Sequence, residues 1–175
     1  VVVAVAIHMA LGEIDAHLLS PDPNRPSLSF APHKLAHRCA VECAVGLPDG
    51  AVALACFNNI YKITPALFAS WLRILQRTEH TVLWLLDDNE WATAALRAHA
   101  QAAGIDAGRL IFSGRSTHAD YREKLTLANI YLDTYPYNAG STARDVLDAR
   151  VPLVTLSGRT PVSRMAGGLL LAAGL

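Results

Sequence analysis

Short, largely apolar runs alternate with longer stretches of helical period from residue 51 onward, and this rhythm limits the possible folds more than any other feature. Strands are predicted at residues 51–56, 81–86, 109–112, 130–133 and 152–156. Helices are predicted at residues 65–77, 90–103, 119–128, 141–149 and 162–173. Strands that are apolar on both faces are typical of a parallel sheet covered by helices on two sides. Right-handed crossovers then predict a doubly wound, Rossmann-like α/β domain.

The first part of the chain differs in character from the rest. Residues 1–45 are predicted to form an irregular segment, because prolines interrupt any long element between residues 21 and 50. Residues 46–175 are predicted to form one domain. The sequence stops inside an apolar run, so we expect this domain to be truncated at its C-terminal end.

Composition narrows the function classes. Fifteen basic residues balance fifteen acidic ones, so no global field favours nucleic acid or an anionic membrane, and any anion site must be local. No apolar stretch is long enough for a membrane span. Three cysteines without framework spacing favour a reducing compartment, and we expect a cytoplasmic protein. A zinc site is a weaker alternative to ordinary loop and core positions for four closely spaced residues: His33, His37, Cys39 and Cys43.

The most informative motif runs from residue 132 to residue 145. It reads as a strand end, a loop with proline, asparagine and glycine, and a helix that begins at Ser141 and Thr142. The unpaired N–H groups and dipole of a helix start favour an anion there. Asp145 lies one turn later on the same helix face, where it could accept hydrogen bonds from a ribose. The alternative is a capped helix with a solvated carboxylate.

Two other loops carry residues that suit a nucleotide ligand. Asn59 and Lys62 follow the first predicted strand, and a lysine there suits a diphosphate, although it could be an ordinary surface lysine. His118, Tyr121 and Lys124 share one helix face, where an aromatic ring flanked by hydrogen-bond donors suits a nucleobase. A solvated helix face with a half-buried tyrosine explains the same spacing. The sequence contains no Gly-x-Ser-x-Gly elbow, Walker A loop or Gly-x-Gly-x-x-Gly fingerprint.

Several segments in the same order and spacing resemble the carboxyl-terminal half of the catalytic region of protein O-GlcNAc transferases and SPINDLY-like proteins. The segments are residues 46–48, 56–65, 82–86, 132–139 and 163–166. The resemblance implies the C-terminal lobe of a GT-B glycosyltransferase, which holds the nucleotide sugar. It covers about residue 46 to residue 175, and residues 1–45 match poorly.

The resemblance also implies roles for individual residues. Lys62 is expected to contact the diphosphate and assist its departure, with Asn59 close by. Ser141 and Thr142 match a hydroxyl pair at the phosphates, and Asp145 matches a carboxylate on the ribose. Three further positions fall near the base or ribose: His118, Tyr121 and Lys124. One departure is Gly140, because family members usually carry a histidine there.

The implied function is transfer of N-acetylglucosamine from UDP-GlcNAc to serine or threonine hydroxyls of proteins, by an inverting reaction that needs no metal cofactor. The protein acceptor would bind through regions outside this chain, so we expect the fragment alone to be weak or inactive. Two alternatives stay open. One is a relative that uses GDP-fucose, and the other is a degenerate, non-catalytic nucleotide-binding or scaffold module.

Overall fold

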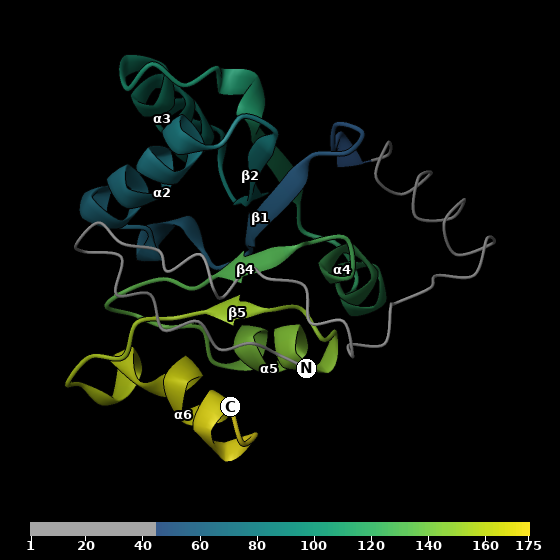
Figure 1. Ribbon diagram of the computed structural model, residues 1–175, viewed down its shortest axis with the longest axis vertical. Coiled ribbons are helices and arrows are strands. Elements are labelled where there is room, and N and C mark those ends of the chain that lie inside the picture. Colours follow the sequence, from purple (N-terminus) through teal and green to yellow (C-terminus); the bar gives the residue numbers. More distant parts are fainter. Residues whose placement is uncertain (1–44) are drawn as a thin grey trace.

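A computed structural model of the chain describes residues 45–175, which form a sheet with helices on both faces (Figure 1). The strands are β1 (Val52–Cys56), β2 (Thr81–Asp87), β3 (Leu110–Gly114), β4 (Ile130–Leu132) and β5 (Leu153–Val154). The helices are α2 (Pro65–Arg77), α3 (Glu90–Ala102), α4 (His118–Leu125), α5 (Ser141–Asp148) and α6 (Met165–Ala172). Short 3-10 helices occur at Ile60–Lys62, Ala107–Arg109 and Pro161–Ser163.

All strand pairs are parallel, and the order across the sheet is β3-β2-β1-β4-β5. The chain therefore builds outward from β1 to β3, crosses back, and continues from β4 to β5 in the other direction. β1 pairs with β2 from Val52 opposite Thr81, and with β4 at Leu54 opposite Ile130. The prediction of a doubly wound, Rossmann-like parallel sheet is confirmed.

Alternate strand residues pack into two separate hydrophobic cores, one on each face of the sheet, as expected for a sheet covered on both faces. Leu83 and Leu85 of β2 pack with Trp71 and other residues of α2. Their neighbours Val82 and Trp84 face the opposite core, which α4, α5 and α6 complete. Figure 1 shows α2 and α3 on one side of the strands and α5 and α6 on the other.

Local signals explain where several helices begin. The Thr64 hydroxyl accepts a hydrogen bond from the Leu67 amide, and Pro65 occupies the first helical position, where its missing N–H costs nothing. Asn89 caps α3 in the same way through the Ala92 amide, at 2.8 Å. These caps explain why the predicted starts of α2 and α3 match the structure.

The bounds of several other helices and strands differ from those predicted. The helix predicted at residues 162–173 is divided, because buried Ser163 closes a 3-10 turn with Thr160 before α6 begins at Met165. The helix predicted at residues 119–128 begins one residue earlier and ends at Leu125. Arg109, predicted in a strand, lies in a 3-10 helix and donates to the Thr81 carbonyl at 3.0 Å. The irregular segment predicted at residues 1–45 lies outside the described residues except for Val45.

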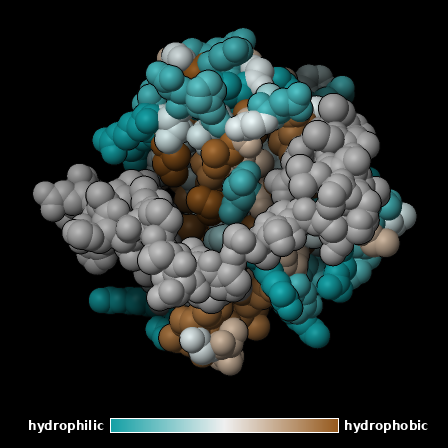
Figure 2. Space-filling view, turned by 45° about the vertical axis from the view of Figure 1, so that its right-hand side comes forward, coloured by the Kyte–Doolittle hydropathy of each residue, from teal (hydrophilic) through white to brown (hydrophobic). Residues whose placement is uncertain are grey.

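Apolar surface is gathered in places on the outside of the domain. In the space-filling view, hydrophobic residues line a central hollow, and hydrophilic residues lie above it (Figure 2). A cavity of about 560 Å³ runs between α2 and the ends of β4 and β5, where Trp71, Leu132 and Val154 contribute apolar walls.

Candidate nucleotide-binding site

The strand order places the candidate site at the edge of the sheet that is formed by the carboxyl ends of the strands, next to β1 and β4. The connections from β1 and β4 leave in opposite directions, toward α2 and α5, although the two strands are neighbours. Ligands of open α/β sheets bind at such a reversal, beyond the carboxyl ends of the strands. The two loops that meet here are residues 57–62, which carry Asn59 and Lys62, and residues 133–140, which lead to Ser141 and Thr142 at the start of α5.

A buried carboxylate, Asp133, holds the loop after β4 in shape. Its Oδ1 accepts hydrogen bonds from the backbone amides of Thr134 and Ala139, both at 2.7 Å. The same oxygen accepts from Asn58 Nδ2 at 3.2 Å, while Oδ2 accepts from the Thr155 hydroxyl at 2.7 Å. Burial raises the pKa of Asp133, and these hydrogen bonds oppose the rise. Both oxygens of the carboxyl group accept hydrogen bonds from the protein, so we assign Asp133 a structural role.

A second layer of hydrogen bonds completes the loop. Asn58 Nδ2 also donates to the Thr134 hydroxyl at 2.9 Å, and that hydroxyl donates to the Tyr137 carbonyl at 2.7 Å. Asn138 Nδ2 donates to the Thr134 carbonyl at 2.7 Å. The peptide bond of Tyr135-Pro136 is cis. Because Asn58, Thr134 and Asn138 are all buried, the loop has a single well-defined shape at the start of α5.

Lys62 crosses from the first loop to the second. Its Nζ donates to the Asn138 carbonyl at 3.3 Å and lies 3.9 Å from the centre of the Tyr137 ring. The side chain is half-buried. The Lys62 ammonium therefore lies where the strand order reverses. Its partner, Asn138, is two residues before Gly140, the N-cap residue of α5.

The start of α5 lacks a side-chain cap. Gly140 is its N-cap residue, and no side chain caps the helix. Ser141 is exposed and Thr142 half-buried. A Cβ atom at Gly140 would lie 2.5 Å from the terminal methyl group of Met165, so the methionine occupies the space that a side chain at residue 140 would need.

The predicted base and ribose residues also come together. His118 Nε2 lies 3.5 Å from Asp145 Oδ1, and the ring centres of His118 and Tyr121 are 6.3 Å apart. The Tyr121 hydroxyl is buried next to Thr142, yet no group in the described structure forms a hydrogen bond of good geometry with it. Burial, and then the negative charge of Asp145, raise the pKa of Tyr121. The phenol is therefore neutral and free to donate.

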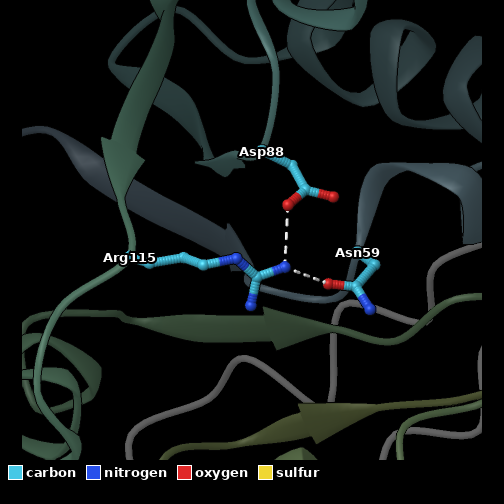
Figure 3. A network of polar contacts seen from close by, with 3 residues as sticks. All are labelled: Asn59, Asp88 and Arg115. Atoms are coloured by element: carbon cyan, nitrogen blue, oxygen red, sulfur yellow. Dashed lines mark hydrogen bonds and ion pairs between the residues drawn. The ribbon is translucent and has the colours of Figure 1, made fainter.

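Two predicted residues are placed differently from the rest. Lys124 is half-buried on α4, and its ammonium makes no hydrogen bond or ion pair with any described residue. Asn59 is joined to the ends of two other strands, since its Oδ1 accepts from Arg115 Nη2 at 2.7 Å and the same nitrogen lies 2.7 Å from Asp88 Oδ1 (Figure 3).

Sequence reasoning missed the residues that shape the site. Asn58, Asp133, Thr134 and Asn138 stand inside the quoted motifs, but no role was predicted for them. The available signal was polar residues directly after buried strands, which must find hydrogen-bond partners if they too are buried. Asn58 lies about 75 positions from its partners Asp133 and Thr134, so spacing along the sequence does not identify these contacts.

The described part of the chain offers no group of three or more potential metal ligands. Cys56 is a free, fully buried thiol, and burial raises its pKa to about 12. The zinc alternative at His33, His37, Cys39 and Cys43 lies outside the described residues. None of the described helices has the length and apolarity needed to cross a membrane.

Comparison with known proteins gives one consistent result. The sequence profile of glycosyl transferase family 41 matches residues 34–175. The probable UDP-N-acetylglucosamine–peptide N-acetylglucosaminyltransferase SEC of Arabidopsis thaliana is 36% identical over 130 residues, which are 74% of this chain and 13% of that protein. The UDP-N-acetylglucosamine–peptide N-acetylglucosaminyltransferase of Caenorhabditis elegans is 32% identical over 129 residues, 74% of this chain and 11% of that protein.

A solved structure resembles the chain over most of its length. It is a lysine-to-methionine mutant of the O-GlcNAc transferase of Thermobaculum terrenum, with a TM-score of 0.69 and 26% identity. The match covers 89% of this chain and 27% of that one. This chain therefore spans only a small part of the proteins it resembles.

Proposed function

The chain belongs to glycosyl transferase family 41, and on that premise we propose that it is the nucleotide-sugar-binding lobe of a GT-B protein O-GlcNAc transferase. The nucleotide sugar would be UDP-GlcNAc, and the acceptor a serine or threonine hydroxyl of a protein. The named relatives act with UDP-N-acetylglucosamine on peptides, which supports this substrate pair. Because the chain spans 13% or less of these two relatives, the acceptor would bind to parts of the protein outside it.

One observation carries the proposal: the Lys62 ammonium and the uncapped start of α5 converge at the reversal of the sheet. A diphosphate placed there would meet a point charge from one side and backbone N–H groups from the other. The Ser141 and Thr142 hydroxyls would add further donors. Asp145 lies one turn into α5, close to His118 and Tyr121 at the start of α4, and the ribose and base would extend there.

The chemistry follows from this arrangement. The acceptor hydroxyl attacks the anomeric carbon of the sugar and gives up its proton to water or to the departing diphosphate, and the bond from that carbon to the diphosphate oxygen breaks with inversion. Negative charge then grows on the departing UDP. Lys62 and the amides of α5 would stabilise that charge in a fixed geometry, the role that a divalent metal has in other enzymes.

Binding of the free nucleotide tests the proposal in this chain. We expect UDP to bind saturably in isothermal titration, and GDP more weakly. Saturation-transfer measurements with UDP-GlcNAc and GDP-fucose, side by side, separate the two candidate nucleotide sugars. Tighter binding of GDP and GDP-fucose would favour a fucosyltransferase relative. No UDP binding at millimolar concentration, by protein that unfolds cooperatively, would contradict the proposal for this lobe.

A non-catalytic module is the second candidate, and one observation favours it. Gly140 supplies no side chain at the start of α5, and the Met165 methyl group fills the adjacent space. The full-length parent decides between the two. Retained nucleotide binding without transfer to any peptide would support the module, whereas turnover that depends on Lys62 would support the enzyme.

A further inference from the structure

One guanidinium joins the ends of three neighbouring strands. Asn59 follows β1, Asp88 follows β2 and Arg115 follows β3. Arg115 Nη2 lies 2.7 Å from Asn59 Oδ1 and 2.7 Å from Asp88 Oδ1, and Figure 3 shows it between the two. The Arg115 side chain is 65% exposed and Asp88 is 24% exposed, so the contact lies at the open edge of the sheet.

The contact fixes the chemical sense of the Asn59 amide. An asparagine can present either its oxygen or its NH2 group to a neighbour, and the two differ by a half-turn of the side chain. A guanidinium has only N–H donors, so it accepts no hydrogen bond and must face the oxygen. The Asn59 NH2 group is thereby turned away from Arg115. It donates to no other group in the part of the chain that the structure describes.

The free NH2 group belongs to the loop that carries the candidate diphosphate lysine. The backbone amide of Lys62 donates to the Asn59 carbonyl at 3.0 Å, which closes a single 3-10 turn. The two side chains therefore start from one rigid turn. A hydrogen-bond donor held beside a lysine suits the oxygens of a phosphate, which only accept.

We propose that Arg115 is a positioning residue that sets the hydrogen-bonding polarity of Asn59, so that the Asn59 amide donates to an oxygen of the bound diphosphate. This inference rests on the proposed function. Asp88 anchors the same guanidinium nitrogen and offsets its charge, so Arg115 acts on the ligand through Asn59. Removing Arg115 leaves the amide free to turn its oxygen toward the phosphates, where it repels them.

The test compares UDP with uridine, which lacks phosphates, by isothermal titration of the chain and its variants. We expect Arg115→Met to weaken UDP binding by about five-fold and to leave uridine binding unchanged, because one oriented hydrogen bond to an anion is lost. Arg115→Lys keeps a cation that only donates, and it should restore UDP affinity to within about two-fold. Arg77→Met is the matched control, since Arg77 ends α2 at the opposite edge of the sheet.

A double variant separates positioning from direct attraction. If Arg115 acts through Asn59, then Arg115→Met has no further effect on UDP affinity once Asn59→Ala is present. An undiminished effect in the Asn59→Ala background would overturn the inference and indicate that the guanidinium attracts the diphosphate by itself. Equal weakening of UDP and uridine by Arg115→Met would also overturn it, because that result indicates a general loss of structure.

The two proposals fail in different ways. If the wild-type chain binds UDP no more tightly than uridine, the phosphate site is wrong, and the inference is overturned with it. If the wild-type chain prefers UDP and Arg115→Met keeps that preference, the proposed function stands and the role of Arg115 does not. In each variant, a cooperative unfolding transition by circular dichroism establishes that the protein is folded.

Discussion

The loop after β4 and the first turns of α4 and α5 meet at the same edge of the sheet, but the protein holds them differently. In the loop, buried Asp133, Asn58 and Asn138 each hold the chain through hydrogen bonds of 2.7–3.2 Å, so the diphosphate side is shaped before any ligand arrives. On the base side, His118 reaches Asp145 only at 3.5 Å, and the Tyr121 hydroxyl has no hydrogen-bond partner of good geometry.

This difference predicts which side of the site contributes mainly to affinity and which contributes mainly to specificity. A preorganised phosphate site gains affinity because its donors need no reordering. A side with unpaired polar groups gains specificity, because a ligand that satisfies those groups is distinguished from one that does not. Substitutions on the two sides should therefore affect different quantities, and the following predictions are arranged by the size of the expected effect.

The largest effect is expected from Asp133→Ala. It leaves four buried or half-buried donors without their acceptor, and we expect a loss of about 3–5 kcal/mol in the free energy of unfolding. Urea denaturation followed by circular dichroism measures it. Asp148→Ala is the control, because that half-exposed carboxylate has only a 4.0 Å ion pair with Arg144, and its loss should cost less than about 0.5 kcal/mol. Similar losses for both variants would refute the structural role of Asp133.

The next effect is on phosphate recognition. We expect Lys62→Ala to weaken UDP binding about ten-fold or more and to leave uridine binding unchanged, since the ammonium would contact the diphosphate and not the uridine. In the full-length parent, the same substitution should lower kcat/KM by about two decades, because leaving-group stabilisation is lost as well. Paired titrations and steady-state kinetics provide the two measurements. An unchanged kcat/KM would remove Lys62 from the reaction.

Asp145→Ala should act on the other side of the site. We expect UDP and uridine to lose affinity by the same factor, about three- to ten-fold, because the ribose is common to both ligands. Isothermal titration with each ligand measures the ratio. Asp148→Ala, one turn further along α5, is again the control. A loss confined to UDP would show that residue 145 senses the phosphates, and the assignment of the two sides would then be wrong.

The sequence predicted the elements of this fold well because their signals are local. An apolar strand core, the Thr64 cap and Pro65 all act within a few residues, and α2 begins and ends where predicted. The helix near the C-terminus was predicted less well, because the buried Ser163 turn depends on packing that periodicity does not report. Helix periodicity alone therefore joined two elements into one.

The site was predicted in part for the same physical reason. Residues on one helix face, such as His118 and Tyr121, come together by helix geometry, which the sequence contains. The Asp133 network and the Arg115 contact join loops that follow different strands, so they depend on strand order and register. Neither can be read from spacing along the chain. The residues that position the site were therefore missed, and the ligand contacts expected from the sequence stay predictions.

The smallest effect, and the one that separates stability from binding, is expected at Tyr121. Its hydroxyl is buried with no partner of good hydrogen-bonding geometry, so Tyr121→Phe should raise the free energy of unfolding by up to about 1 kcal/mol. The same substitution should weaken UDP and uridine binding about three-fold, because the ligand would supply the missing partner. Urea denaturation and titration measure the two changes, which have opposite consequences for the protein. A variant that is more stable and binds both ligands as tightly as the wild type would show that Tyr121 supports the core alone, and the base side would then extend no further than His118 and Asp145.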